Sequence, residues 1–182
     1  GLDLRLRALA NSRAMLLEER GLDPADAVSQ LDGDRTEPVD LHRFARHVRG
    51  EHLPHALIVD CSASAEVAAH YPRWLAAGIH VVTPNKHAGS GTWAPIPPTK
   101  APPRRGGARF RYEATVGAGL PVMLTLRNLI DTGDELTGID GMLSGTLAWL
   151  FNRFDGSVPF SQLVHEAQPL GYTEPDPRDD LS

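Results

Sequence analysis

The sequence predicts an α/β fold, because short apolar segments alternate with amphipathic helical segments. The clearest unit is a strand, helix and strand over residues 57–83, in which apolar runs at 57–61 and 79–83 flank a helix beginning at Ser64. Short apolar runs joined by a helix are typical of buried parallel strands. A glycine-rich stretch at 116–120 stands before a further helical pattern. These patterns predict a parallel sheet followed by a smaller α+β region.

The first fifty residues predict a strand, an irregular segment and a helix. Leucines alternate with charged residues over residues 2–7, and this period of two predicts a strand that runs to Ala10. Residues 13–39 show weak periodicity and several turn-forming residues, so irregular chain with short helical pieces is expected. Asp40 is a suitable N-cap for a one-sided apolar helix that Gly50 ends.

The helix between the two central strands contains a proline. It is expected to begin at Ser64 and to end at Gly78, with Pro72 inside it. Because proline lacks an N–H group and its ring clashes with the preceding turn, we expect a kink or an unpaired carbonyl there. Cys61 reads as a small buried apolar residue of the central strand rather than as a nucleophile.

The second half of the chain begins with a segment rich in Gly, Pro and basic residues at 89–107, which predicts a loop or flexible linker. The elements expected after it are a strand at 110–115, a helix from Pro121 to Gly133, a strand at 136–143, a helix after Ser144 and a helix from about 157 to 170.

Composition limits the classes of partner. A net charge of -5 with scattered arginines argues against nucleic acid and against an anionic membrane surface. No apolar run approaches the length of a membrane span. The single cysteine excludes an intramolecular disulfide framework and fits a reducing compartment, so a cytoplasmic location is expected. Because the chain opens on Gly1 and on strand-like residues, we expect it to be a piece of a longer protein.

Two polar motifs follow the central strands. Ser62, Ala63 and Ser64 stand at the carboxyl end of the first strand, where open α/β sheets bind ligands. The alternative is simple N-capping of the next helix. Lys86 follows the second strand within Thr83-Pro84-Asn85-Lys86, and there it could stabilise a developing alkoxide or hold a carboxylate. The alternative is a solvated surface lysine.

A possible cation site lies after the strand at 110–115. Glu113 offers a carboxylate and the bent backbone of residues 116–120 offers carbonyl oxygens, a set that suits a hard cation. The alternative is a tight turn whose glycines serve geometry alone. The eight histidines lack metal-ligand spacing, so no zinc site is expected.

The last twelve residues, GYTEPDPRDDLS, are acidic. They contain the carboxylates Glu174, Asp176, Asp179 and Asp180, together with two prolines that favour extended backbone. Such a cluster can hold an ammonium group. The alternative is an exposed acidic turn.

These motifs carry a resemblance to a known family. Asp60-Cys61-Ser62, Thr83 to Lys86, Tyr112 to Pro121, Gly141 to Leu147 and above all Gly171 to Ser182 resemble homoserine dehydrogenase. The likeness is to the dehydrogenase half of bifunctional aspartokinase/homoserine dehydrogenases, and it covers nearly the whole chain. It implies a truncated Rossmann-like NAD(P)-binding domain over residues 1–115 and part of an α+β substrate-binding and dimerisation domain over residues 116–182.

The resemblance implies NAD(P)H-dependent reduction of L-aspartate 4-semialdehyde to L-homoserine, on the route to threonine and methionine. Lys86 would touch the cofactor, NADP or NAD, and would lie close to the reacting carbon. The other residues that it places at the cofactor are Ser62, the backbone of Gly171 and, near the ribose or its phosphate, Asn11. The residues that it places at the amino-acid substrate are Glu174, which would bind the ammonium, and Asp179 and Asp180.

The same resemblance implies a sodium-type monovalent cation held by Glu113 and by the carbonyls of Val116, Ala118 and Leu120. It also implies a homodimer or higher homo-oligomer, possibly fused to aspartokinase in the parent chain.

Three departures from the family pattern limit the expectation. The family's glycine-rich dinucleotide loop would precede residue 1, and its catalytic Asp and Lys would follow residue 182, so we expect the fragment alone to be inactive. Residues 93–107 are proline-rich where the family has a helix. Two alternatives stay open: a dehydrogenase for another small amino-acid carbonyl compound, and a fragment that serves only as a folded or dimerising module.

Overall fold

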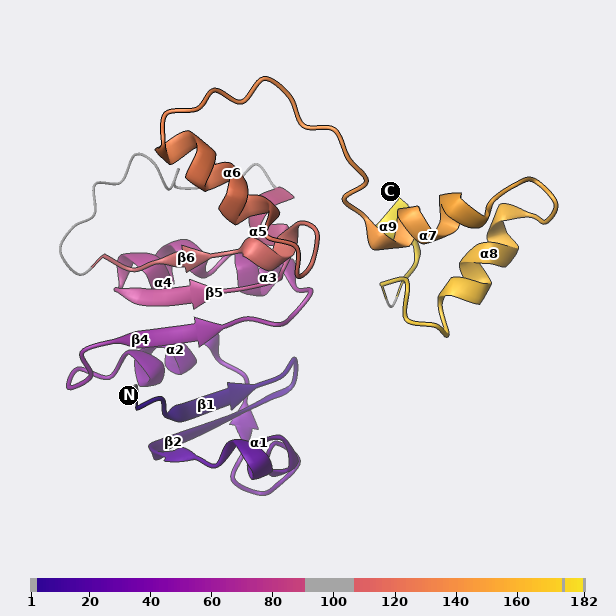
Figure 1. Cartoon of the computed structure of the whole chain (residues 1–182). Coiled ribbons are helices and arrows are strands. Elements are labelled where there is room, and N and C mark those ends of the chain that lie inside the picture. The colour runs from indigo at the N-terminus through magenta and orange to yellow at the C-terminus, as the bar shows by residue number, and fades with distance from the viewer. Residues whose placement is uncertain (1–2, 91–106, 175, 182) are drawn as a thin grey trace. The chain divides into compact units, whose positions relative to one another are not determined.

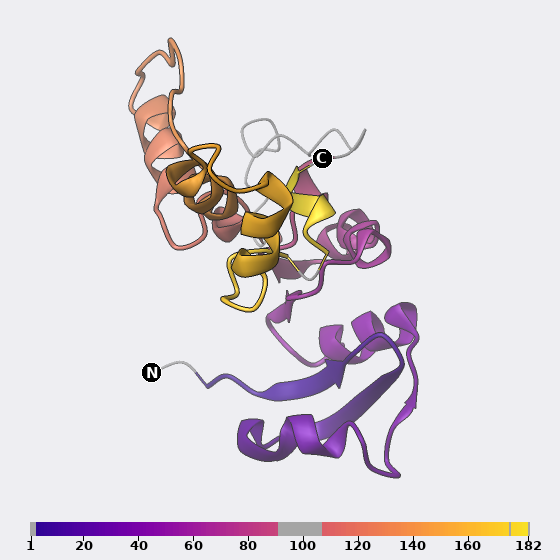
Figure 2. The same cartoon turned by 90° about the vertical axis from the view of Figure 1, so that its right-hand side faces the viewer.

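The computed structural model describes residues 3–90, 107–174 and 176–181. The chain divides into two compact units, unit 1 over Gly1–Tyr112 and unit 2 over Glu113–Ser182. Unit 1 combines strands with covering helices, whereas unit 2 consists of helices joined by irregular segments, as Figures 1 and 2 show.

An antiparallel sheet begins unit 1. Its strands are β1 (Leu6–Ala10), β2 (Ala14–Leu22) and β3 (Glu37–Pro38), in that order. β1 confirms the strand predicted at the start of the chain. Asn11 closes the β1–β2 turn, because its side-chain oxygen accepts two backbone hydrogen bonds, of 2.8 and 2.9 Å.

The prediction of irregular chain over residues 13–39 is wrong at β2. Met15 and Leu16 are neighbours, yet both are buried, with exposed fractions of 1% and 2%. A strand covered on both faces does not alternate between apolar and polar residues, so its period is hidden. Helix α1 (Pro24–Gln30) follows, and its Ala27 packs in one cluster with Leu16.

Helix α2 (Leu41–Arg49) confirms the predicted helix and its ends. Asp40 caps the first turn by accepting backbone hydrogen bonds of 2.9 and 3.0 Å, and these bonds lower the pKa of Asp40. Gly50 ends the helix with φ of 41°, in the left-handed region that favours glycine.

A parallel sheet completes unit 1, with β4 (Ala56–Val59), β5 (Ile79–Val82) and β6 (Phe110–Arg111) in that order. The strand, helix and strand predicted over residues 57–83 is confirmed. The strand predicted at 110–115 ends at Arg111, because the chain turns into the 3-10 helix η1 (Glu113–Thr115). Segment 91–106 lies outside the described residues, and with it nearly all of the predicted loop.

The helix between β4 and β5 is broken in two, as Pro72 predicted. Helix α3 spans Ala65–Ala68 with Ser64 as its N-cap, and α4 spans Tyr71–Ala76 with Pro72 in its first turn, where a missing N–H group costs little. Tyr71 and Trp74 of α4 join Ile58, Ile79 and Val81 of the sheet in the main core of unit 1.

Cys61 is exposed, so the prediction of a buried cysteine is wrong. β4 ends at Val59, two residues earlier than the apolar run suggests, and Cys61 therefore lies in the link that follows the strand. Helix α5 (His87–Ser90) follows β5.

Unit 2 contains η1 and the helices α6 (Val122–Asp131), α7 (Gly145–Arg153), α8 (Phe160–Ala167) and α9 (Arg178–Leu181). The three helices predicted here are confirmed, with ends shifted by a few residues. Leu150, Leu163 and Ala167 form a small core between α7 and α8.

The strand predicted at 136–143 is wrong. These residues are irregular and exposed, and they pair with no strand of the described residues. An alternating pattern marks a strand only where a neighbouring strand can take up its backbone hydrogen bonds.

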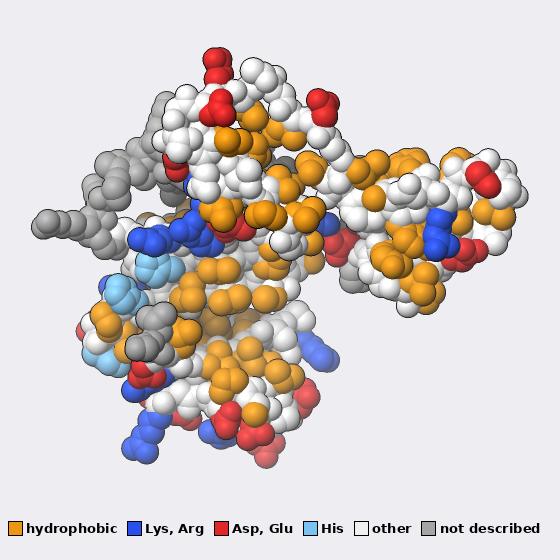
Figure 3. Space-filling view, in the orientation of Figure 1, with side chains coloured by type: hydrophobic (Ala, Val, Ile, Leu, Met, Phe, Trp, Pro, Cys, Tyr) orange, Lys and Arg blue, Asp and Glu red, His pale blue; other side chains and the backbone are white. Residues whose placement is uncertain are grey.

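Apolar side chains also stay exposed on the parallel sheet. Ala56 and Ile58 of β4 face the core, whereas Leu57 and Val59 point to the opposite face and are 45% and 59% exposed. Figure 3 shows the apolar side chains gathered over this part of unit 1. In the described ranges of the chain, no helix has the length and apolar character that crossing a membrane requires.

Candidate functional site

A buried polar network joins the links that follow β4 and β5. It consists of Asp60, Tyr71, Thr83 and Asn85, each of which is at most 6% exposed. Asp60 receives hydrogen bonds on its carboxylate from the Tyr71 hydroxyl and, at 3.1 Å, from the Asn85 amide. The Thr83 hydroxyl donates to the Asp60 carbonyl at 2.9 Å, and the Asn85 backbone N–H donates to the Thr83 hydroxyl at 2.9 Å. The two links are therefore fixed to each other.

Tyr71 is the only member that comes from a helix rather than from a strand end. Burial, together with the hydrogen bond to the Asp60 carboxylate, raises the pKa of Tyr71. The phenol therefore stays protonated at all physiological pH values and acts as a permanent donor. A donor of this kind satisfies a carboxylate that is otherwise costly to bury.

Ser62 lies on the network. Its backbone N–H donates to the Asp60 carboxylate at 2.8 Å, and its hydroxyl accepts from the Ser64 backbone N–H at 3.3 Å. Ser64 caps α3 as predicted, since its hydroxyl accepts from Val67 at 3.3 Å. The Asn85 amide also donates to the Ser64 carbonyl at 2.9 Å. Ser62 thus has a fixed backbone position at the carboxyl end of β4.

Lys86 follows the network directly and is exposed. Its backbone carbonyl accepts a hydrogen bond of 3.1 Å from Gly89, which closes the first turn of α5. The Asn85 side-chain oxygen accepts from His87 at 3.0 Å. The backbone on both sides of Lys86 is thereby held at the carboxyl end of β5.

Asn11 lies after β1, and the arrowheads of β1, β4 and β5 point the same way in Figure 1. Asn11, Ser62 and Lys86 therefore follow strand ends on one side of unit 1. The side-chain oxygen of Asn11 is used by the turn that it closes, whereas the side-chain NH2 group takes no part in those two bonds.

The acidic segment of unit 2 is joined to the start of α7 by Asp180. The Asp180 carboxylate accepts from the Glu174 backbone N–H at 2.7 Å and from the Thr146 hydroxyl at 3.2 Å. The Tyr172 carbonyl, 2.6 Å from the Thr146 hydroxyl, shares the same hydroxyl proton. Glu174 and Asp180 are thus brought together, both half-buried. The side chain of Asp179 lies outside what the structure describes.

Gly171 has φ of 74° and closes the turn that follows α8. Its N–H donates to Gln168 at 3.0 Å, and the next N–H donates to Ala167 at 3.1 Å, as in the common glycine ending of a helix. Asp176 lies beside Arg178 in the same segment, and the hydrogen bonds from Arg178 lower the pKa of Asp176 to about 2.

The turn that follows Glu113 contains two residues in the left-handed region of backbone conformation. Gly117 has φ of 71° and Ala118 has φ of 49°, and among the described residues Ala118 is the only residue other than glycine in the left-handed region. Such a conformation costs about 1–3 kcal/mol and is concentrated at functional sites. Glu113 pairs with Arg127 at 3.2 Å, and the Leu120 carbonyl accepts from Val122 at 2.8 Å while keeping a second lone pair.

The structure adds positions to which the sequence assigned no role. Tyr71 reads as one apolar residue on a helix face, and Thr146 reads as part of a turn. Neither pattern reveals that a distant carboxylate accepts from the hydroxyl. The sequence did contain one signal for the network. Asp60 is a charged residue directly after a wholly apolar strand, and a buried charge requires hydrogen-bond partners.

The comparisons with known proteins decide the family. Residues 2–96 match the family model for the NAD binding domain of homoserine dehydrogenase, and residues 121–182 match the model for homoserine dehydrogenase itself. The chain belongs to the homoserine dehydrogenase family. The resemblance seen in the sequence is thereby confirmed, as is the α/β fold with a Rossmann-like NAD-binding domain.

Relatives agree with this family. The chain is 47% identical over all of its 182 residues to a chloroplastic bifunctional aspartokinase/homoserine dehydrogenase of Daucus carota, of which it covers 20%. It therefore spans about a fifth of the length of that homoserine dehydrogenase relative.

Solved structures show the same fold. A Candida auris protein of unknown function matches with a TM-score of 0.77 and 33% identity, covering 97% of this chain and 51% of that one. A hyperthermophilic archaeal homoserine dehydrogenase in complex with NADPH matches with a TM-score of 0.68 and 21% identity, covering 96% of this chain and 54% of that one. The second likeness shows the fold alone.

Proposed function

We propose that the protein containing this chain is a homoserine dehydrogenase that reduces L-aspartate 4-semialdehyde to L-homoserine with NADPH or NADH. The observation that carries the proposal is the buried network of Asp60, Tyr71, Thr83 and Asn85. It fixes the strand ends of a unit whose sequence matches an NAD-binding domain, and it fixes them on the side where open α/β sheets bind ligands.

The cofactor supplies the hydride that adds to the aldehyde carbon. In the proposal, Ser62 and Lys86 contact the nicotinamide portion, Asn11 lies near the ribose or its phosphate, and the backbone of Gly171 approaches the cofactor. Within this chain, Lys86 is the residue that acts on the reacting carbonyl group, through its side-chain ammonium. It stabilises the negative charge that develops on the substrate oxygen before that oxygen receives a proton.

The substrate is an amino acid, so its ammonium group needs a counter-charge. Glu174 supplies it, and Asp179 and Asp180 complete that side of the pocket. The hydrogen bonds that Asp180 accepts from the Glu174 backbone N–H and from Thr146 support this role, because they hold the backbone of Glu174 beside the start of α7.

A sodium-type cation is the proposed occupant of the Glu113 turn, with the carbonyls of Val116, Ala118 and Leu120 as the other ligands. The left-handed backbone at Ala118 supports it, since carbonyl oxygens must turn toward a common centre to hold a hard cation. Replacing sodium by a large organic cation in the buffer is expected to lower the thermal stability of the protein and to leave a Glu113→Gln variant unaffected.

The organisation of the parent protein is also part of the proposal. Residues 1–115 would belong to the cofactor domain and residues 116–182 to the substrate and dimerisation domain of a homodimer or higher homo-oligomer. The bifunctional relative supports fusion to an aspartokinase. Cytoplasmic location stays a prediction. Light scattering tests the oligomeric state, sequencing of the parent gene tests the fusion to aspartokinase, and cell fractionation tests the location.

Turnover of the whole parent protein tests the function. With aspartate semialdehyde and NADPH, the nicotinamide absorbance is expected to fall as homoserine forms. A matched assay with other small amino-acid aldehydes and ketones tests the alternative substrate class, which is favoured if one of them is turned over and aspartate semialdehyde is not. No turnover with any of them, despite correct folding, favours a purely structural module.

A further inference from the structure

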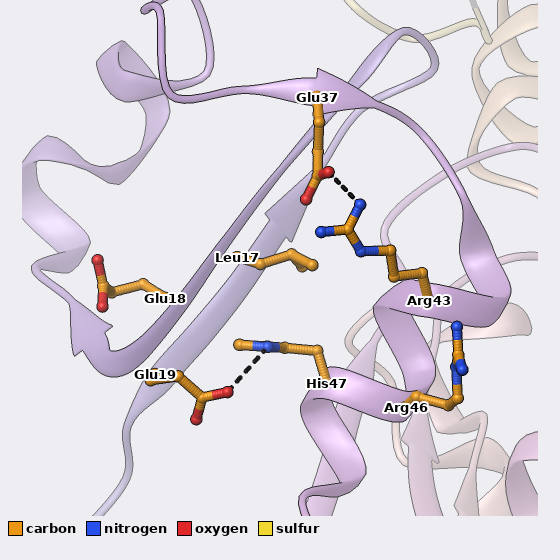
Figure 4. A pocket seen from close by; sticks show the side chains of 7 residues that line it. All are labelled: Leu17, Glu18, Glu19, Glu37, Arg43, Arg46 and His47. Atoms are coloured by element: carbon orange, nitrogen blue, oxygen red, sulfur yellow. Dashed lines mark hydrogen bonds and ion pairs between the residues drawn. The ribbon is translucent and has the colours of Figure 1, made fainter.

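The open pocket of unit 1 lies between α2 and the strands β2 and β3, and has a volume of about 590 Å³ (Figure 4). Its acidic side chains already have basic partners. The pairs are Glu18 with Arg35, Glu19 with Arg7 and Glu37 with Arg43. The pocket therefore offers a charged ligand little uncompensated charge. Contacts of a different kind occur in unit 2, where one side of α7 holds the acidic segment.

Three residues of α7 share one side of the helix. Thr146, Trp149 and Arg153 stand at positions i, i+3 and i+7, which fall within about 60° of one another around a helix axis. Leu150, the neighbour of Trp149, is fully buried in the small core between α7 and α8. Trp149 is partly buried and packs against the same core. The core thereby supports the indole ring on α7.

The Trp149 ring contacts the acidic segment through Tyr172. The two rings are stacked, with centroids 5.4 Å apart and planes inclined by 23°. Stacking of aromatic rings at such a distance is favourable. The Arg153 guanidinium lies 4.4 Å from the centre of the Trp149 ring, and this cation–π contact helps to hold the indole in place. The half-exposed Tyr172 ring is therefore held by a partner that belongs to α7.

The backbone of Tyr172 is held as well. Its carbonyl lies 2.6 Å from the Thr146 hydroxyl, and its N–H donates to the Ala167 carbonyl of α8 at 3.1 Å. Two residues further on, the Glu174 N–H donates to the Asp180 carboxylate at 2.7 Å. Residues 172–174 are thus attached through a ring and through the backbone. A displacement of the Tyr172 ring would shift the backbone that leads to Glu174.

We propose that Trp149 is a positioning residue for the amino-acid substrate: it holds Tyr172, and through Tyr172 it sets where Glu174 meets the substrate ammonium. The inference rests on the proposed substrate site, in which Glu174 supplies the counter-charge. Trp149 itself need not touch the substrate. Loss of the stack lets residues 172–174 occupy other positions, so the ammonium group meets its counter-charge less often.

The kinetic consequence follows from where the ammonium group stands in the substrate. It is remote from the aldehyde carbon, so its contact with Glu174 is the same before and during hydride transfer. An interaction of this kind lowers KM without changing kcat. Weakening it through Trp149 should therefore raise the KM for aspartate semialdehyde alone.

The test is steady-state kinetics of the whole protein with aspartate semialdehyde and NADPH. Trp149→Leu is expected to raise the KM for aspartate semialdehyde about three- to tenfold. The KM for NADPH and kcat should stay within about twofold of the wild type. Trp149→Phe keeps a ring that can stack, so it should restore the wild-type KM within about twofold. Phe151→Leu, at an exposed ring of the same helix, is the matched control and should leave all three constants unchanged.

A double-variant cycle tests whether Trp149 acts through Tyr172. Tyr172→Leu removes the same stack from the other side, so Trp149→Leu should raise KM no further in a Tyr172→Leu background. Three results overturn the proposal: additive increases in the double variant, a Trp149→Leu KM equal to that of the wild type, and a Trp149→Phe KM as high as that of Trp149→Leu.

Amide hydrogen exchange separates a failure of the positioning role from a failure of the proposed function. If the wild type does not turn over aspartate semialdehyde, the proposed function fails, and exchange of the Glu174 amide tests the positioning role by itself. This amide is expected to exchange about threefold or more faster in Trp149→Leu than in the wild type, and Trp149→Phe should behave as the wild type. Equal exchange in Trp149→Leu and the wild type contradicts the role of Trp149.

Discussion

The strand ends of unit 1 and the acidic segment of unit 2 are held in different ways. In unit 1, the carboxylate of Asp60 is buried and receives donors from a helix and from two links. In unit 2, the carboxylate of Asp180 is half-buried and holds its neighbours through two hydrogen bonds. We therefore expect the proposed cofactor edge to resist local unfolding more strongly than the proposed substrate segment.

Removing the centre of the buried network should have the largest effect on stability. Asp60→Ala removes the carboxylate that accepts from the buried Tyr71 hydroxyl and Asn85 amide, at an expected cost of about 2–4 kcal/mol in the free energy of unfolding. Urea denaturation of the whole protein measures it. Asp34→Ala, at an exposed position of the same unit, is the control and should change the free energy by less than about 0.5 kcal/mol. Equal costs for both variants would show that the network contributes nothing.

Removing the centre of the acidic segment should instead affect binding. Asp180→Ala removes the acceptor of the Glu174 backbone N–H, so the KM for aspartate semialdehyde is expected to rise about ten- to hundredfold. The free energy of unfolding is expected to change by about 1 kcal/mol or less, because Thr146 keeps its hydrogen bond to the Tyr172 carbonyl. Steady-state kinetics measures the first and denaturation the second. Asp176→Asn, in the same segment, should leave KM unchanged within about twofold. A loss of stability as large as that of Asp60→Ala would remove the contrast between the two regions.

A smaller change tests the donor from α4. Tyr71→Phe removes one hydrogen bond to a carboxylate and keeps the ring packing with Trp74 and Phe110, so about 1–2 kcal/mol of stability should be lost. The matched control is Tyr172→Phe, at a half-exposed ring of unit 2. If the two tyrosine variants unfold at the same denaturant concentration, the phenol is not a structural donor.

The smallest effect concerns the titration of Asp176. Its hydrogen bonds with Arg178 lower its pKa from 3.8 to about 2, so the ion pair contributes above the unfolded pKa and is lost as the pH falls through about 2. The side chain of Asp176 is 41% exposed and its partner Arg178 is 88% exposed, so we expect little change in global stability. Carbon NMR of the Asp176 carboxyl group should show a midpoint near pH 2. A midpoint near pH 4 would mean that the contact with Arg178 does not persist in solution.

The sequence predicted most of unit 1 because its elements carry local signals. Asp40 and Gly50 mark the ends of α2, and the apolar runs at 57–61 and 79–83 mark β4 and β5. The strand β2 was missed because burial on both faces removes the alternation that identifies a strand. The strand at 136–143 was predicted wrongly. Alternating apolar residues show that one face of a strand could be buried, but they do not show that a neighbouring strand is there to pair with it.

The candidate site was predictable only in part. Ser62, Lys86 and Glu174 stand in motifs that the sequence displays. The partners that hold these motifs are separated from them in the chain, as Tyr71 is from Asp60 and Thr146 is from Asp180. The sequence pattern shows Tyr71 only as part of a helix face and Thr146 only as part of a turn. Their hydroxyl groups become hydrogen-bond donors to carboxylates only in the folded chain.

The central claim is that Lys86, held at the end of β5 by the buried network, acts on the reacting carbonyl group. The most direct measurement is the turnover of aspartate semialdehyde with NADPH by the whole protein, compared between the wild type and Lys86→Ala. We predict that the wild type forms homoserine and that Lys86→Ala lowers kcat about a hundredfold or more without unfolding the protein. Unchanged turnover in the Lys86→Ala variant would contradict the claim.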